Sequence, residues 1–119
     1  MITIGICGSR SFSDYNLFCE KLNYIIQNLE NYKFISGGCK DSADELIQRF
    51  CHENNLELIE HLPDYEKYGK YASLKRNTLI ANDSDYLIAF YDGKSRGTLD
   101  TINKFRKKET ENKLKIIKI

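Results

Sequence analysis

The sequence carries almost no net charge, because 18 lysines and arginines face 17 aspartates and glutamates and leave a formal charge of +1. Proteins that bind nucleic acid usually show a basic excess or a basic stripe, so this balance disfavours a nucleic-acid partner. The densest basic segment, residues 104–118, is interrupted by acidic residues and is typical of a solvated helix end. No apolar run approaches the length of a membrane span, so no membrane partner is expected.

Metal-binding and nucleophilic patterns are also missing. The chain has 4 cysteines and 2 histidines, without a CxxC pair or a metal-ligand spacing, so we expect no metal. No Ser/His/Asp or Cys/His set can be assembled. GxGxxG and the Walker spacing G-x-x-x-x-G-K-[ST] are absent, which argues against an ordinary dinucleotide dehydrogenase and a Walker-type NTPase, and no cofactor is expected. Met1 leads directly into strand-like residues, which favours reduced thiols and a cytoplasmic location.

What the sequence does contain is a regular alternation of two patterns. Short apolar runs predict strands, and apolar residues at helical spacing predict helices. We expect strands at residues 2–7, 32–36, 56–62, 85–91 and 113–119, and helices within residues 17–29, 43–51, 70–82 and 98–108. The alternation predicts an α/β fold: a three-layer, Rossmann-like, five-stranded parallel sheet with helices on both faces. A length of 119 residues fits one domain, residues 1–119.

The loops after the strands indicate where a ligand would bind. In such sheets ligands bind at the carboxyl ends of the strands, where the strand order reverses. We favour the order 3-2-1-4-5, because it makes neighbours of the Gly- and Ser-rich loops after strands one, two and four. The alternative order 2-1-3-4-5 would bring the loop at residues 62–69 opposite the first loop. That loop holds the single proline, Pro63, and is long enough to suggest a function.

Gly37 and Gly38 end the second strand, just before a helix. Two explanations stay open. Glycine would let a phosphate approach the free N–H groups of the helix start. The other explanation is a tight strand-to-helix turn, which Ser42 and Glu45 support because they have the spacing of a capping box.

Several polar residues in these loops are candidate ligands, each with a structural alternative. Arg10 could hold a phosphate or form a surface ion pair. Asp41 could accept from a ribose hydroxyl or cap a helix, and Thr98 could donate to a phosphate or cap one. An Arg76–Asn77 pair on a helix is usually exposed, and Asp44 in a first turn usually caps. The candidate ligand-binding residues are Gly8, Ser9, Arg10, Gly37, Gly38, Asp41, Ser42, Tyr68, Lys70, Arg76, Asn77, Asp92, Gly93, Ser95, Gly97 and Thr98.

Four blocks, "GSRSFSD", "ISGGCKDSADELI", "LPDYEKYGKYASLKRN" and "DYLIAFYDGKSRGTLDTI", resemble the YspA/cpYpsA-related family of the SLOG superfamily. They cover most of the chain, in the family's order. The sequence departs from the usual motifs at Cys39, Ser42, Tyr65 and Ser73. The resemblance implies a Rossmann-like fold that binds a nucleotide or a nucleotide-derived ligand. It leaves a homodimer open, although no residue pattern marks an interface.

More distant relatives in the superfamily include the Lonely Guy phosphoribohydrolases and the DNA-processing protein A family. The phosphoribohydrolases carry a catalytic glutamate in P-G-G-x-G-T-x-x-E. Counting from Gly97-Thr98 places Thr101 at that position, and Asp100 lies one residue early. The resemblance therefore implies that this acid is missing from its place.

Two functions follow as hypotheses. The first is a binding module that holds a nucleotide-derived signal or metabolite, such as an ADP-ribose-like molecule, as a sensor or a sequestering protein. The second is an N-glycosidic hydrolase or transferase acting on a nucleotide or nucleoside derivative. Its candidate catalytic residues are Asp100, Asp92, Asp41 and Arg76.

Overall fold

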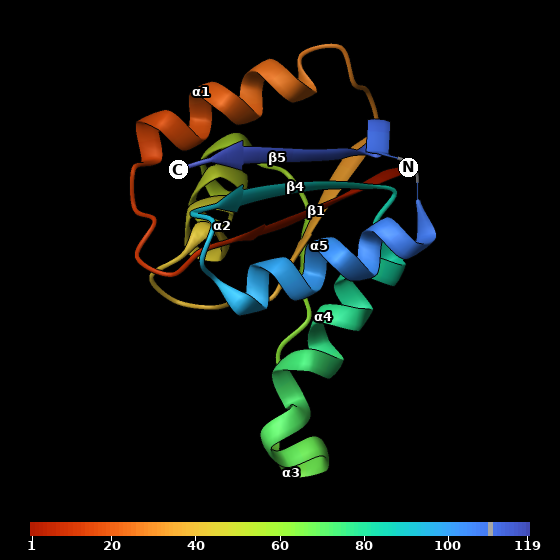
Figure 1. The fold of residues 1–119 in the computed structure, drawn as a ribbon. Coiled ribbons are helices and arrows are strands. Elements are labelled where there is room, and N and C mark those ends of the chain that lie inside the picture. The colour runs from red at the N-terminus through yellow and green to blue at the C-terminus, as the bar shows by residue number, and fades with distance from the viewer. Residues whose placement is uncertain (110) are drawn as a thin grey trace.

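The chain forms one parallel sheet of five strands in the order β3-β2-β1-β4-β5 (Figure 1). The structure is a computed structural model that describes residues 1–109 and 111–119. The strands are β1 Ile2–Gly8, β2 Tyr32–Ser36, β3 Leu58–Glu60, β4 Tyr86–Tyr91 and β5 Leu114–Lys118. The predicted strand order and the predicted α/β class are confirmed.

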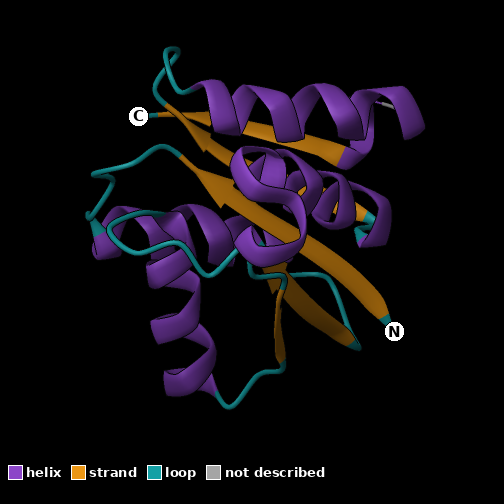
Figure 2. Cartoon of the chain, turned by 90° about the horizontal axis from the view of Figure 1, so that it is seen from below, coloured by secondary structure: helices purple, strands orange, loops and turns teal. Residues whose placement is uncertain are grey.

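Helices cover both faces of the sheet and make it the middle layer of three (Figures 1 and 2). Helices α1 (Tyr15–Ile26) and α2 (Ala43–Asn54) pack on one face, and α4 (Ala72–Asp83) and α5 (Arg96–Lys108) pack on the other. A short helix α3 (Tyr65–Tyr68) and the 3₁₀ turn η1 (Gly69–Tyr71) precede α4, and η2 (Glu111–Lys113) precedes β5. Figure 1 shows α3 at the far end of α4, away from the sheet.

The sheet separates two apolar cores, one on each face. Side chains alternate along a strand, so Ile4 and Ile6 of β1 face α1 and α2, while Cys7 faces α4 and α5. The first core is rich in aromatic rings; the Phe18 and Phe90 centroids lie 4.9 Å apart. The second core is smaller and consists of Cys7, Ile35, Ile80, Ala81, Leu87, Ala89, Ile102, Phe105 and Leu114. Cys7 is thus buried at the carboxyl end of β1, directly under the loops.

The largest differences from the predicted elements lie between β2 and α4. The third strand spans only Leu58–Glu60 rather than residues 56–62, because it is an edge strand that pairs with β2 alone. The segment predicted as a loop contains α3. Asp64 caps the N-terminus of this helix: its Oδ1 accepts from the N–H of Lys67 at 3.1 Å. A single turn of helix is too short to produce a periodic apolar pattern.

The reversal of strand order lies between β1 and β4, where the two connections leave the sheet in opposite directions. The loops after β1 and β4 meet here: the backbone N–H of Ser9 donates to the carbonyl of Phe90 at 2.9 Å. The loop after β2 joins them, since Ser11 N–H donates to the carbonyl of Asp41 at 2.6 Å. No helix among the described residues is long and apolar enough to cross a membrane.

Candidate functional site

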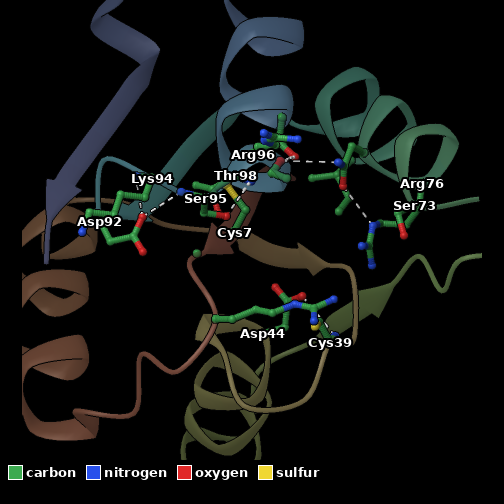
Figure 3. Close-up of a pocket in the computed structure, with 16 residues that line it drawn as sticks. Cys7, Cys39, Asp44, Ser73, Arg76, Asp92, Lys94, Ser95, Arg96 and Thr98 are labelled. Carbon is green, nitrogen blue, oxygen red and sulfur yellow. Dashed lines mark hydrogen bonds between the residues drawn. The ribbon is translucent and has the colours of Figure 1, made fainter. Parts of the chain in front are cut away.

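A cavity of about 500 Å³ opens at the carboxyl ends of the central strands (Figure 3). It lies between the loops after β1, β2 and β4, the N-terminal part of α5 and one side of α4. Its lining is mostly polar and charged, and consists of Cys7, Gly8, Arg10, Cys39, Asp44, Ser73, Arg76, Asn77, Ile80, Asp92, Lys94, Ser95, Arg96, Gly97, Thr98 and Thr101. The position is the one that the strand order predicts for a ligand.

The N-terminus of α5 opens directly into this cavity. Ser95 caps the helix: its Oγ accepts from the N–H of Thr98 at 3.3 Å and donates to Thr98 Oγ1 at 3.0 Å. The first N–H groups of a helix have no partner within it. Those of Arg96 and Gly97 belong to this set, and the first turn of α5 contains no acidic residue. This helix end therefore offers N–H donors and a positive dipole end to an anion.

Asp92 fixes the loop that leads into α5. Its Oδ1 accepts from the backbone N–H groups of Lys94 at 2.8 Å and Ser95 at 2.9 Å. These bonds stabilise the carboxylate and hold the pKa of Asp92 below its usual range. On the other side, the backbone N–H of Asp92 donates to Ser9 Oγ at 3.0 Å. The buried Ser9 thus anchors this loop to the end of β1 and does not line the cavity itself.

The N-terminus of α2 is different, because side chains of the chain itself accept from N–H groups in its first turn and in the loop just before it. The N–H of Cys39 donates to Asp44 Oδ2 at 3.1 Å, and the N–H of Asp44 donates to Ser42 Oγ at 3.1 Å. The N–H of Asp41 donates to Glu45 Oε2 at 3.2 Å. Two acidic residues, Asp44 and Glu45, stand in the first turn. The position that the Gly-Gly loop could have offered to a phosphate is filled by carboxylates of the chain itself.

The two glycines after β2 are needed for protein contacts. A Cβ at Gly37 would lie 2.8 Å from Cζ of Arg76, so the glycine makes room for this guanidinium. Gly38 has φ +68°, a conformation that L side chains rarely adopt. Of the two explanations for these glycines, the structure supports the one in which they serve the turn and its packing.

Arg76 is held in the cavity wall by partners on both sides. Its Nη1 donates to the carbonyl of Gly37 at 2.9 Å, and its Nε donates to Asn77 Oδ1 at 3.0 Å. Asn77 in turn donates to Asp100 Oδ2 at 3.1 Å, and the same oxygen lies 2.8 Å from Nζ of Lys104. The expectation of an exposed Arg76–Asn77 pair is wrong for Asn77, which is only 5% exposed. This chain of bonds fixes the guanidinium against β2.

Asp44 is a buried carboxyl in the cavity lining. It is 8% exposed, and this burial raises its pKa from the ordinary 3.8 to about 6. The N–H of Cys39 and the charge of Arg76 act in the opposite direction and favour the carboxylate. Figure 3 shows Asp44 and Cys39 on one side of the cavity and Ser95, Arg96 and Thr98 on the other. The cavity therefore has a carboxylate side at α2 and a donor side at α5.

The structure brings half of the predicted ligand-binding residues together around this cavity. Those in its lining are Gly8, Arg10, Arg76, Asn77, Asp92, Ser95, Gly97 and Thr98. Ser9, Gly37 and Ser42 lie outside the lining but contact lining residues through hydrogen bonds. The remaining ones also lie outside the lining: Gly38, Asp41, Tyr68, Lys70 and Gly93. Tyr68 lies instead in a separate hollow beside Tyr71 and Leu74 of η1 and α4.

The carboxylates considered for catalysis are also separated by the structure. Asp92 lines the cavity, while Asp41 is exposed on the loop outside it. Asp100 lies behind Asn77 and is not in the lining. Thr101, at the position where the phosphoribohydrolases carry glutamate, does line the cavity, and its hydroxyl donates to the carbonyl of Gly97 at 3.1 Å.

Sequence reasoning did not select eight residues that line the cavity: Cys7, Cys39, Asp44, Ser73, Ile80, Lys94, Arg96 and Thr101. A signal was available for some of them. Lys94 and Arg96 are cations in a loop already chosen for its glycines. Asp44 gave no such signal, because an acid in the first turn of a helix is ordinary and because its surroundings include residues of α4 and β3 that are distant in the sequence.

Comparison with known proteins places the chain in a family. Residues 3–68, more than half of the chain, match the family described as "YspA, cpYpsA-related SLOG family". The chain belongs to this SLOG family. The matched range includes β1, α1, β2, α2, β3 and α3, and therefore the loops that carry Arg10 and Asp44. The predicted family is confirmed. With the Rossmann-like fold, this membership suggests a nucleotide-related ligand.

Among curated proteins, "Uncharacterized protein R261" of Acanthamoeba polyphaga mimivirus is similar to this SLOG protein. The two sequences are 34% identical over an alignment of 127 residues, and the alignment covers 93% of this chain and 68% of the viral protein. A light-independent protochlorophyllide reductase iron-sulfur ATP-binding protein of Cereibacter sphaeroides is 34% identical over 59 residues, 47% of this chain. The match spans 20% of that protein's length. No solved structure gives a significant match.

Proposed function

We propose that this SLOG protein binds a nucleotide-derived small molecule, such as an ADP-ribose-like signal or metabolite, in the cavity at the carboxyl edge of the sheet. It acts as a sensor or a sequestering protein, and the binding itself is the function. The observation that carries the proposal is the N-terminus of α5, which opens into the cavity without an acidic residue in its first turn. The phosphate of the ligand lies at the N–H groups of Arg96 and Gly97.

The charges of the lining support an anionic ligand. Four cationic residues, Arg10, Arg76, Lys94 and Arg96, face two acidic ones, Asp44 and Asp92. Arginine and lysine near a helix N-terminus add to the attraction for phosphate. A volume of about 500 Å³ lies within the range of small-molecule sites, about 300–1,000 Å³. Charge and size together favour a nucleotide over an uncharged nucleoside.

A second candidate function is N-glycosidic cleavage in the same cavity, and Asp44 is the observation that favours it. A carboxyl with a pKa of about 6 can take up and release a proton near neutral pH. In hydrolysis the carboxylate would take a proton from water while the water oxygen bonds to the anomeric carbon. The bond from that carbon to the base nitrogen breaks with its electron pair on the base, which takes a proton from the solvent, and the Asp44 carboxyl returns its proton to the solvent. Of the acidic residues that line the cavity, Asp44 is buried and Asp92 is exposed.

A thermal-shift screen with AMP, ADP-ribose, NAD and cyclic ADP-ribose, followed by mass spectrometry of each mixture, tests both functions. A ligand at 100 times its dissociation constant stabilises the folded state by about 2.7 kcal/mol, which is readily measured. A shift with the ligand recovered intact supports binding as the function. Release of a free base supports cleavage. The absence of both a shift and a product with all four compounds would contradict the proposal.

Two substitutions at opposite ends of α5 show whether a thermal shift comes from binding in the cavity. Arg96→Ala removes an exposed cation from the cavity, whereas Lys107→Ala removes an exposed cation from the last turn of the same helix. We expect Arg96→Ala to reduce the shift and Lys107→Ala to leave it unchanged. Equal shifts for both variants would mean that the ligand binds elsewhere.

A further inference from the structure

The two sides of the cavity differ in charge, and this difference sets the direction in which a nucleotide can lie. On the α5 side, N–H groups and the cations Lys94 and Arg96 suit a phosphate. On the α2 side, the carboxylate of Asp44 would repel it. A ligand whose phosphate lies at α5 therefore presents its next group, the ribose, toward α2.

Asp44 keeps hydrogen-bonding capacity for that group. A carboxylate has about four acceptor positions. The N–H of Cys39 donates to one of these positions, and the N–H of Gly37 also stabilises the carboxylate. Arg76 faces the carboxylate, yet no ion pair joins the two side chains within the described parts of the chain. A buried acceptor that lines a cavity without a cation bound to it can accept from a donor on the ligand.

The charge of Arg76 determines which kind of ligand donor Asp44 can accept from. A cationic donor would have to enter beside the guanidinium of Arg76, which is held in place by Gly37 and Asn77. A hydroxyl is neutral and donates a short, strong hydrogen bond to a carboxylate. Among the parts of a nucleotide, the ribose carries the hydroxyl groups.

We propose that Asp44 accepts a hydrogen bond from a ribose hydroxyl of the ligand, and that it thereby selects ribonucleotide-derived molecules over their deoxyribose forms. The inference rests on the proposed function and deepens it, since it concerns the same cavity. Asp44 is a specificity-determining residue of the binding site.

The same contact makes binding dependent on pH. The groups that act on Asp44 are Arg76 from α4, Cys7 from β1, Glu60 from β3 and the N–H of Cys39 from the loop, and Arg10 lines the same cavity. Only the ionised carboxyl is an acceptor on all its oxygens. Burial raises the pKa of Asp44 to about 6, so the ribose contact is present above this pH and is lost as the pH falls through it.

Calorimetric titration at pH 7.5 tests the inference with AMP and ADP-ribose, each beside its 2′-deoxyadenosine and 3′-deoxyadenosine forms. The wild type should bind the ribose form at least about tenfold more tightly than one of the two deoxy forms. Asp44→Asn keeps the shape of the side chain and an acceptor for Cys39 N–H. Because Cys39 N–H uses that single acceptor oxygen, this variant should bind the ribose and deoxyribose forms with nearly equal affinity.

A control and a pH series complete the experiment. Glu45→Gln changes the neighbouring acid, which does not line the cavity, and should keep the ribose preference. Repeating the titrations at pH 5 should abolish the preference of the wild type, while the phosphate's own titration affects wild type and Asp44→Asn alike. Equal binding of ribose and deoxyribose forms by the wild type, or a preference that survives Asp44→Asn, overturns the inference and leaves the proposed function standing. If the wild type binds neither AMP nor ADP-ribose, both fall.

Discussion

The loops that lead into α2 and α5 look alike in sequence and differ in the structure. Both contain glycine, serine or threonine and lysine, and both precede a helix. In the α2 loop, Asp44 and Glu45 accept from backbone N–H groups, so the helix end is already occupied by negative charge. In the α5 loop, Asp92 lies before the cap, and the first turn contains no acid. Only the second helix end remains open to an anion.

This difference teaches that glycine and hydroxyl content does not by itself identify a phosphate site. Acidic residues in the first turn of the helix are the better indicator, because they place negative charge at the dipole end that a ligand phosphate would use. In the α2 loop the glycines make room for Arg76 and for a left-handed turn. Five substitutions, two of them with a matched control, would test the comparison.

The largest expected effect is on stability, from Asp44→Asn. Burial raises the pKa of Asp44 from 3.8 to about 6, so the ionised carboxyl destabilises the fold at neutral pH by about 3 kcal/mol. A raised acid pKa favours folding fully below pH 3.8, and this contribution is lost as the pH rises through 6. We expect Asp44→Asn to increase the free energy of unfolding by up to about 3 kcal/mol at pH 7.5, with no increase at pH 3.5.

Denaturant unfolding at the two pH values measures this difference. The ligand-free variant would then be more stable than the wild type while discriminating less between ribose and deoxyribose. A variant that is less stable than the wild type at pH 7.5 would show that the carboxylate stabilises the α2 loop more than its burial costs.

The next effect is on affinity, from Gly97→Asp. A Cβ at Gly97 meets no atom within 4 Å, so the substitution fits, and it gives α5 the acidic first turn that α2 has. We expect the affinity for ADP-ribose to fall at least about 100-fold, because the new carboxylate competes for the helix end. Stability should stay the same or rise by about 0.3–1 kcal/mol.

Gly97→Asn is the matched neutral control for this variant. It should keep most of the affinity in calorimetry, since it adds the same volume without the charge. If both variants bind like the wild type, the phosphate does not lie at α5.

Asn77→Ala should have an intermediate effect on both properties. Asn77 joins Arg76 on one side to Asp100 on the other, and it is buried. Its loss leaves buried groups without partners, which typically costs about 1–3 kcal/mol, and releases the guanidinium from its position. We expect lower stability in denaturant unfolding and about tenfold weaker binding. Thr78→Ala, at the next position on α4, should not weaken binding. If Thr78→Ala and Asn77→Ala weaken binding by the same factor, the loss of affinity in Asn77→Ala comes from helix stability alone.

The smallest effects come from the two helix caps. Ser42→Ala and Ser95→Ala each remove a side chain that accepts from the first turn, so each should cost about 1 kcal/mol in denaturant unfolding. Only Ser95→Ala should also reduce affinity, because Ser95 orders the open helix end in the cavity. Equal losses of affinity in the two variants would argue that both helix ends bind the ligand.

The sequence is sufficient to predict the strand order and the edge of the sheet at which the cavity lies. Alternating strands and helices with right-handed crossovers leave few topologies, and the loop compositions favour the correct one. The family is also recognisable from four blocks of residues. These features depend on residues that are close together in the chain.

The burial of Asp44 and of Asn77 could not be predicted in this way. Each depends on contacts with other elements: Asp44 faces Arg76 of α4 and Glu60 of β3, and Asn77 bonds to Asp100 of α5. Arg76 reaches Gly37, 39 residues away in the chain. An Arg-Asn pair in a weakly amphipathic helix shows no local sign of such contacts. Counting along the sequence makes Asp100 a catalytic candidate, whereas in three dimensions it bonds to Asn77 and does not line the cavity.

The most direct test of the central claim is an amide-resolved NMR titration of the ¹⁵N-labelled protein with ADP-ribose. The claim is that the phosphate binds at α5 and not at α2. It predicts large, saturable shifts for the backbone N–H groups of Arg96 and Gly97, and a much smaller shift for that of Asp41, which lies outside the cavity lining and already donates to Glu45. A larger shift at Asp41 than at Arg96 and Gly97 would contradict it.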